Sequence, residues 1–138
     1  MNKTVTCMMT FLIGSIMVMG QERFNPEKIK AEVHNAILTE AKLTKEEAAA
    51  FFPLLDAMKD KQRSLYKQMK EISMQHPVTD AACRNAIIRR DKLQKEMNSV
   101  EEAYHLKMLK VMASGKVYKA LEVERKFMRK AFRKAVSK

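Results

Sequence analysis

The sequence predicts an all-α fold of four helices, in which two long helices form a central antiparallel hairpin. Glycine and proline, the main turn formers, occur only three times each in 138 residues. Residues that favour strands, such as Val, Ile, Tyr and Thr, never cluster with the alternation of a half-buried strand. After residue 25, apolar residues instead recur three and four positions apart, which is the spacing of amphipathic helices.

The first twenty residues are predicted to be a secretory signal peptide. Residues 1–3 are a short basic start, and residues 5–19 are mostly apolar, with Cys7 as their one ionisable side chain, before the small residue Gly20. This stretch is shorter than the roughly 20 residues of a membrane-spanning helix. We expect cleavage after Gly20, which leaves residues 21–138 as a single exported helical domain. The alternative is an uncleaved N-terminal anchor; after cleavage, no stable membrane insertion is expected.

The first predicted helix follows this segment. Asn25 can cap it, Pro26 suits its first turn, and Glu27 favours the positive end of the helix dipole. Apolar residues continue at helical spacing to about Lys42.

A capping box predicts the start of the second helix. Thr44 is followed three residues later by Glu47, so each side chain can bond the other's backbone N–H, and Leu43 can pack against Ala48. Pro53 is expected to bend the helix near residues 49–53, and Pro77 to end it. The apolar stripe of this helix comprises Ala48, Phe51, Phe52, Leu55, Met58, Leu65, Tyr66, Met69 and Ile72.

The third helix is expected to begin at Thr79 or Asp80, and Ser114 is expected to cap the fourth. The two middle helices are about 30 residues long, or roughly 45 Å each. The short connection between them predicts an antiparallel hairpin. A chain this small cannot surround such long helices, so one face should stay partly exposed, for a second copy or another partner.

At this point the sequence resembles the Spy/CpxP family of periplasmic proteins. The Leu43–Glu47 start is similar to its Leu-Thr-x-x-Gln signature, with Glu47 in place of Gln and able to close the same capping box. The segment 51–55 and residues 116–118 with the basic tail also resemble a subgroup of that family. The resemblance implies a cradle-shaped homodimer. Relatives act as ATP-independent chaperones, as inhibitory partners of envelope-stress sensors, or as metal-responsive proteins.

Catalytic and metal-binding patterns are weak in this sequence. Cys83 would be the one cysteine after cleavage, either a free buried thiol or a link between two subunits. His34, His76 and His105 are far apart, and no two show the spacing of metal ligands on one helix face. We therefore expect no enzyme activity, no cofactor and no resident metal, although a metal held through tertiary or dimer contacts stays an alternative.

The charge pattern carries the functional prediction. The chain has 27 Lys and Arg against 16 Asp and Glu, and basic pairs recur every four residues in the last helix, which makes it a basic amphipathic helix. This face is either simply solvated or attracts acidic partners. Export argues against nucleic acid as that partner.

The predicted function is a periplasmic, ATP-independent chaperone-like or envelope-stress protein that binds unfolded or acidic protein clients. The alternatives are an adaptor or inhibitor of a membrane stress sensor, whose periplasmic domain it would bind, and a metal-responsive binding protein. The basic rim of the site is predicted to be Arg63, Lys67, Arg89 and Arg90. Its apolar contacts are predicted to be Phe51, Phe52, Leu55, Met58, Leu65, Met69 and Met97.

Overall fold

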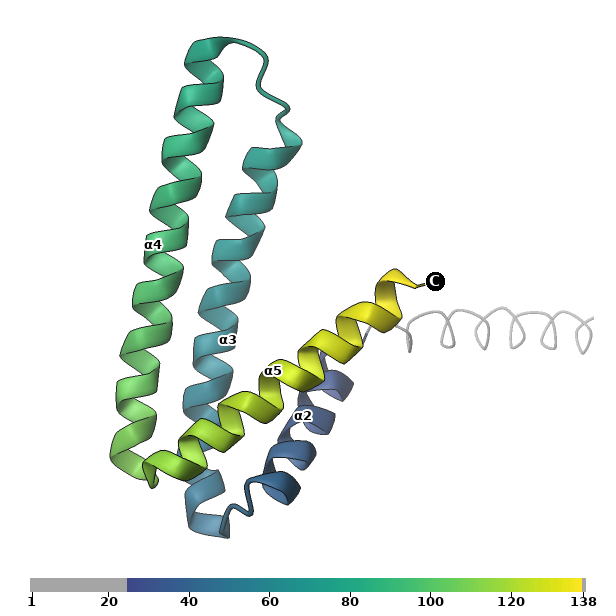
Figure 1. Ribbon diagram of the computed structural model, residues 1–138, viewed down its shortest axis with the longest axis vertical. Coiled ribbons are helices and arrows are strands. Elements are labelled where there is room, and N and C mark those ends of the chain that lie inside the picture. Colours follow the sequence, from purple (N-terminus) through teal and green to yellow (C-terminus); the bar gives the residue numbers. More distant parts are fainter. Residues whose placement is uncertain (1–24, 138) are drawn as a thin grey trace, which may run out of the picture. The chain divides into compact units, whose positions relative to one another are not determined.

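The computed structural model describes residues 25–137 and contains four helices in this range (Figure 1). They are α2 (Pro26–Glu40), α3 (Lys45–Met74), α4 (Asp80–Val111) and α5 (Ser114–Val136). Residues 25–137 contain no strand, which confirms the all-α prediction and the number of helices. The predicted signal peptide lies outside the described residues, and the homodimer stays a prediction.

The chain divides into two compact units, Met1–Asn35 and Ala36–Lys138, with the boundary inside α2. In the described part of the first unit, the side chain of Asn25 accepts a hydrogen bond from the backbone N–H of Glu27 at 3.1 Å. This bond confirms Asn25 as the residue that satisfies a free N–H in the first turn of α2.

The second unit is built on α3 and α4, which lie side by side and are joined by residues 75–79 (Figure 1). They pack because each helix presents an apolar stripe to the other. The core between them contains Leu65, Ile72, Leu93 and Met97, with Met69, Ala86 and Val100 packed against it.

The ends of the long helices follow the predicted capping chemistry. Thr44 and Glu47 form both hydrogen bonds of the capping box at the start of α3. Thr79, one of the two predicted caps of α4, accepts a bond from the N–H of Ala82 at 3.2 Å. α3 is a single helix that runs through Pro53, so this proline does not interrupt it.

The start of α5 differs from the prediction. Ser114 is its first helical residue and not its cap, which is Ala113 without a side-chain hydrogen bond. The reason is local, since the carbonyl of Ala113 already accepts the N–H groups of Lys116 and Val117. Ser114 is therefore one residue too late to have the extended backbone of a cap.

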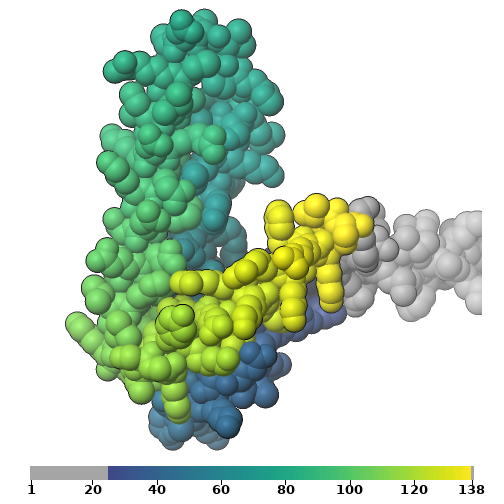
Figure 2. Space-filling model, viewed as in Figure 1, coloured from purple at the N-terminus to yellow at the C-terminus, as the bar shows by residue number. Residues whose placement is uncertain are grey.

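Through its first half, α5 packs on the part of the α3–α4 pair that lies far from the connection 75–79. Val117, Ala120 and Val123 in this half are buried. Figure 2 shows α5 in yellow-green crossing the lower part of the pair, while the upper part around residues 75–79 stays uncovered on this face. In the described part of the chain, none of the helices combines the length and apolar character of a membrane span.

Candidate functional site

The structure places most of the predicted apolar contact residues in the core. Phe51 has none of its surface exposed, and Leu55, Met58, Leu65 and Met97 are also buried. Phe52 and Met69 are half-buried. The five buried side chains pack between the helices, so little of their surface is accessible in this structure.

Among the described residues, twelve large apolar side chains are exposed, and none of them is one of the predicted apolar contact residues. On α3, α4 and their connection they are Tyr66, Met74, Val78, Ile87, Ile88, Leu106, Leu109 and Val111; on α5 they are Tyr118, Met128, Phe132 and Val136. Ile87 and Ile88 could have been found from the sequence, since they fall between Ala86 and Leu93 and outside the inner stripe. Tyr66 could not, because the sequence places it within the apolar stripe of the second helix.

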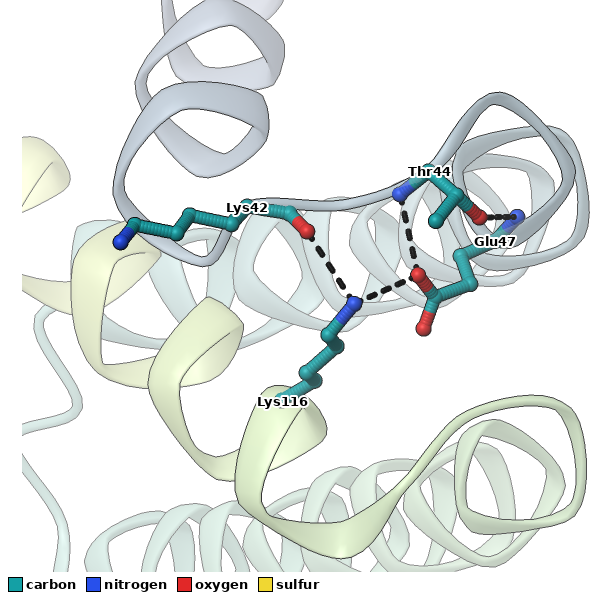
Figure 3. A network of polar contacts seen from close by, with 4 residues as sticks. All are labelled: Lys42, Thr44, Glu47 and Lys116. Atoms are coloured by element: carbon teal, nitrogen blue, oxygen red, sulfur yellow. Dashed lines mark hydrogen bonds and ion pairs between the residues drawn. The ribbon is translucent and has the colours of Figure 1, made fainter.

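A polar cluster fixes the start of α5 against the start of α3 (Figure 3). The ammonium group of Lys116 donates to Oε1 of Glu47 at 2.7 Å and to the carbonyl of Lys42 at 3.1 Å. The same Glu47 oxygen accepts the N–H of Thr44 at 3.0 Å, and the Thr44 hydroxyl accepts the N–H of Glu47 at 3.2 Å. The predicted cap motif therefore both starts α3 and holds α5, while Leu43 beside it is half-buried.

These contacts act on the charge of Glu47. The hydrogen bond from Lys116, followed by that from the Thr44 backbone, lowers the pKa of Glu47 below its ordinary value. Both bonds favour the ionised carboxylate. The bonds that Glu47 accepts are therefore stronger when its side chain is ionised.

Two ion pairs identify the side of the long helices on which α5 lies. Lys59 of α3 pairs with Glu124 of α5, whose side chain is only 6% exposed. Arg125 of α5 lies 4.0 Å from Glu101 of α4. The side of α3 that carries Lys59 and the side of α4 that carries Glu101 therefore face α5.

The same side of both helices continues past α5 towards the connection 75–79. At about 3.6 residues per turn, residues 7 or 11 apart lie on nearly the same face. Arg63, Tyr66 and Lys70 follow Lys59 by 4, 7 and 11 positions, and Ile87 and Arg90 precede Glu101 by 14 and 11 positions. All five are exposed. We call these residues the open surface: Arg63, Tyr66, Lys70, Ile87 and Arg90.

The open surface combines apolar and positive side chains. Tyr66 is 62% exposed and Ile87 is 61% exposed. Residues 61–95 contain nine Lys and Arg against three Asp and Glu, so the surroundings are strongly positive. Such a surface can attract negative charge at a distance and bind apolar groups on contact.

Of the four predicted rim residues, two belong to the open surface and two do not. All four are exposed. Arg63 and Arg90 face the α5 side, whereas Lys67 is turned by about 80° from Lys59, and Arg89 by about 120° from Glu101.

In the described residues, cysteine and histidine form no metal site beside the open surface. Cys83 is a free, half-buried thiol that donates to the carbonyl of Pro77 at 3.3 Å. Residues 25–137 contain no group of three His, Cys, Asp or Glu side chains that could hold a metal ion. A disulfide from Cys83 to a second copy stays the alternative to a free thiol.

The fold and the site together define a small all-α protein with a basic, partly apolar surface on one side of a long helix pair. Compared with models of protein families, with curated proteins and with solved structures, the chain matches none of them. Membership of the Spy/CpxP family therefore stays a prediction from the motif at residues 43–47.

Proposed function

We propose that this protein is an ATP-independent, chaperone-like protein of the periplasm, which binds unfolded or acidic protein clients on the open surface. The observation that carries the proposal is the position of Tyr66 and Ile87. Both are more than half exposed although an apolar core is available beside them. By helical spacing, the exposed cations Arg63, Lys70 and Arg90 lie on the same side of the two helices.

Two physical effects act in sequence in this proposal. Positive charge draws a negative, loosely folded chain towards the surface, an effect that raises encounter rates by about 10- to 1,000-fold and weakens with salt. Apolar contacts with Tyr66 and Ile87 then hold the client near the helices. Binding by several weak contacts allows release without ATP.

Features outside the open surface also support the proposal. The N-terminal pattern of residues 1–20 is typical of export, and the capping box at Thr44 and Glu47 is the element that resembles the Spy/CpxP signature. A homodimer is part of the proposal, because a second copy would extend the surface available to one client.

The test is suppression of aggregation of an unfolding acidic protein, measured by light scattering at low and moderate salt. The double variant Tyr66→Ser/Ile87→Ser should lose most of the protection. The matched control is Ile88→Ser/Leu106→Ser, since both residues are exposed but turned by about 140° from Glu101. Equal protection by both variants, or no protection by the parent at either salt, would contradict the proposal.

The alternative of a sensor adaptor uses the same surface for a different partner. Covalent capture from an envelope extract distinguishes the two functions: many captured proteins support the chaperone, whereas one dominant membrane sensor supports the adaptor. In both cases Tyr66→Ser/Ile87→Ser should reduce capture and the control should not.

A further inference from the structure

The second half of α5 has a regular pattern that the client surface does not use. Over residues 125–136, side chains recur every four positions in four rows that share a chemical type within each row. The two basic rows are Arg125, Arg129, Arg133 and Lys126, Lys130, Lys134; the two apolar rows are Met128, Phe132, Val136 and Phe127, Ala131, Ala135. At about 3.6 residues per turn, the basic rows occupy one half of the helix and the apolar rows the other.

The two halves of α5 differ in their burial and in their contacts with the other helices. The first half is held by Lys116, by the pair of Lys59 with Glu124, and by its buried apolar residues. At the boundary between the halves, Arg125 lies 4.0 Å from Glu101 of α4. The second half contains no buried residue. Its apolar row of Met128, Phe132 and Val136 is exposed, with Phe132 at 70%.

We propose that residues 125–136 of α5 bind the surface of an anionic lipid bilayer, with the basic rows at the headgroups and the row of Met128, Phe132 and Val136 below them. Six Lys and Arg with no Asp or Glu in twelve residues are complementary to a surface of uniform negative charge. A bilayer also offers an apolar layer beneath that charge, so it satisfies both halves of the helix together.

An acidic protein fits this pattern less well than a bilayer does. A negative patch on a protein would pair with the basic rows but would leave Phe132 and Met128 in water. The apolar row is short, so apolar burial contributes little and the charges contribute most of the binding. Attachment should therefore require anionic lipid, and it should weaken as salt is added.

The experiment measures partition of the whole chain onto vesicles of phosphatidylcholine with and without phosphatidylglycerol. The variant Lys130→Gln/Lys134→Gln should lower partition onto the anionic vesicles by about 25-fold, at about fivefold for each charge. The matched control Lys92→Gln/Lys95→Gln removes the same charge from exposed positions of α4 and should have little effect. All variants share residues 1–24, so any contribution of that segment cancels.

A second measurement uses the absence of tryptophan from the sequence. Phe132→Trp should give a blue shift of its fluorescence on anionic vesicles, whereas Val78→Trp, at an exposed position between α3 and α4, should not. Equal losses for the two lysine pairs, or an unshifted spectrum at position 132, would overturn the proposal. Tighter binding to soluble polyglutamate than to vesicles would also overturn it, in favour of an acidic polypeptide. Client protection depends on other helices, so each proposal can fail without the other.

Discussion

The ion pair between Lys59 and Glu124 gives the sharpest prediction about how α5 is held. In the variant Lys59→Met, the carboxylate of Glu124 stays buried without its cation. Breaking a fully buried pair costs about 3–5 kcal/mol. Because the Lys59 side chain is 36% exposed, water screens part of this effect, and we expect a loss of about 2 kcal/mol in the free energy of unfolding.

The remaining variants of this pair should be less destabilised. In Glu124→Leu, the Lys59 ammonium can turn to solvent, and the double variant Lys59→Met/Glu124→Leu leaves no buried charge. The assay is urea unfolding followed by far-ultraviolet circular dichroism, with the slope checked for constancy. The control Lys70→Met, at an exposed position of α3, should stay within about 0.5 kcal/mol of the parent. A loss for Lys59→Met no larger than for this control would refute the reasoning.

Three further predictions test other parts of the structure. Because the pKa of Glu47 is lowered, the stability that Glu47 contributes is fully present above pH 4.5, the ordinary pKa of a glutamate, and is lost as the pH falls through the lowered pKa. In acid unfolding, the stability of Glu47→Gln should therefore depend less on pH than that of the parent. Phe51→Ala should cost about 3–5 kcal/mol in urea unfolding, whereas Tyr66→Ala should cost about 0.5 kcal/mol or less, and similar losses would contradict the assigned burial. The Cys83 thiol is half-buried and donates a hydrogen bond to the Pro77 carbonyl, so sedimentation should give the same mass with and without reductant. A mass halved by reductant would instead show a disulfide between subunits.

Local chemistry made the helices predictable from the sequence. The capping box of Thr44 and Glu47, the cap at Thr79 and the break near Pro77 depend on residues a few positions apart. Their side chains bond backbone groups within one turn, so their effect does not depend on the rest of the fold. The helix limits therefore agreed closely with the structure.

The site was harder to predict because it depends on contacts distant in sequence. Lys116 reaches Glu47 across 69 positions, and no periodicity indicates that bond. Leu65 and Tyr66 show the second difficulty: they are neighbours at the edge of one stripe, yet the first is buried and the second exposed. A stripe shows which face is apolar, but it does not show that Leu65 packs in the core with Leu93 and Met97 of α4.

The most direct test of the client surface is site-specific photocrosslinking to an unfolding client. A photoreactive amino acid at position 87 is compared with one at position 106, since Ile87 and Leu106 are both on α4 and are similarly exposed at 61% and 56%. The proposed surface predicts strong crosslinking from position 87 and little from position 106. Equal crosslinking from both positions, or a stronger product from position 106, would contradict a client site on the α5 side of the helix pair.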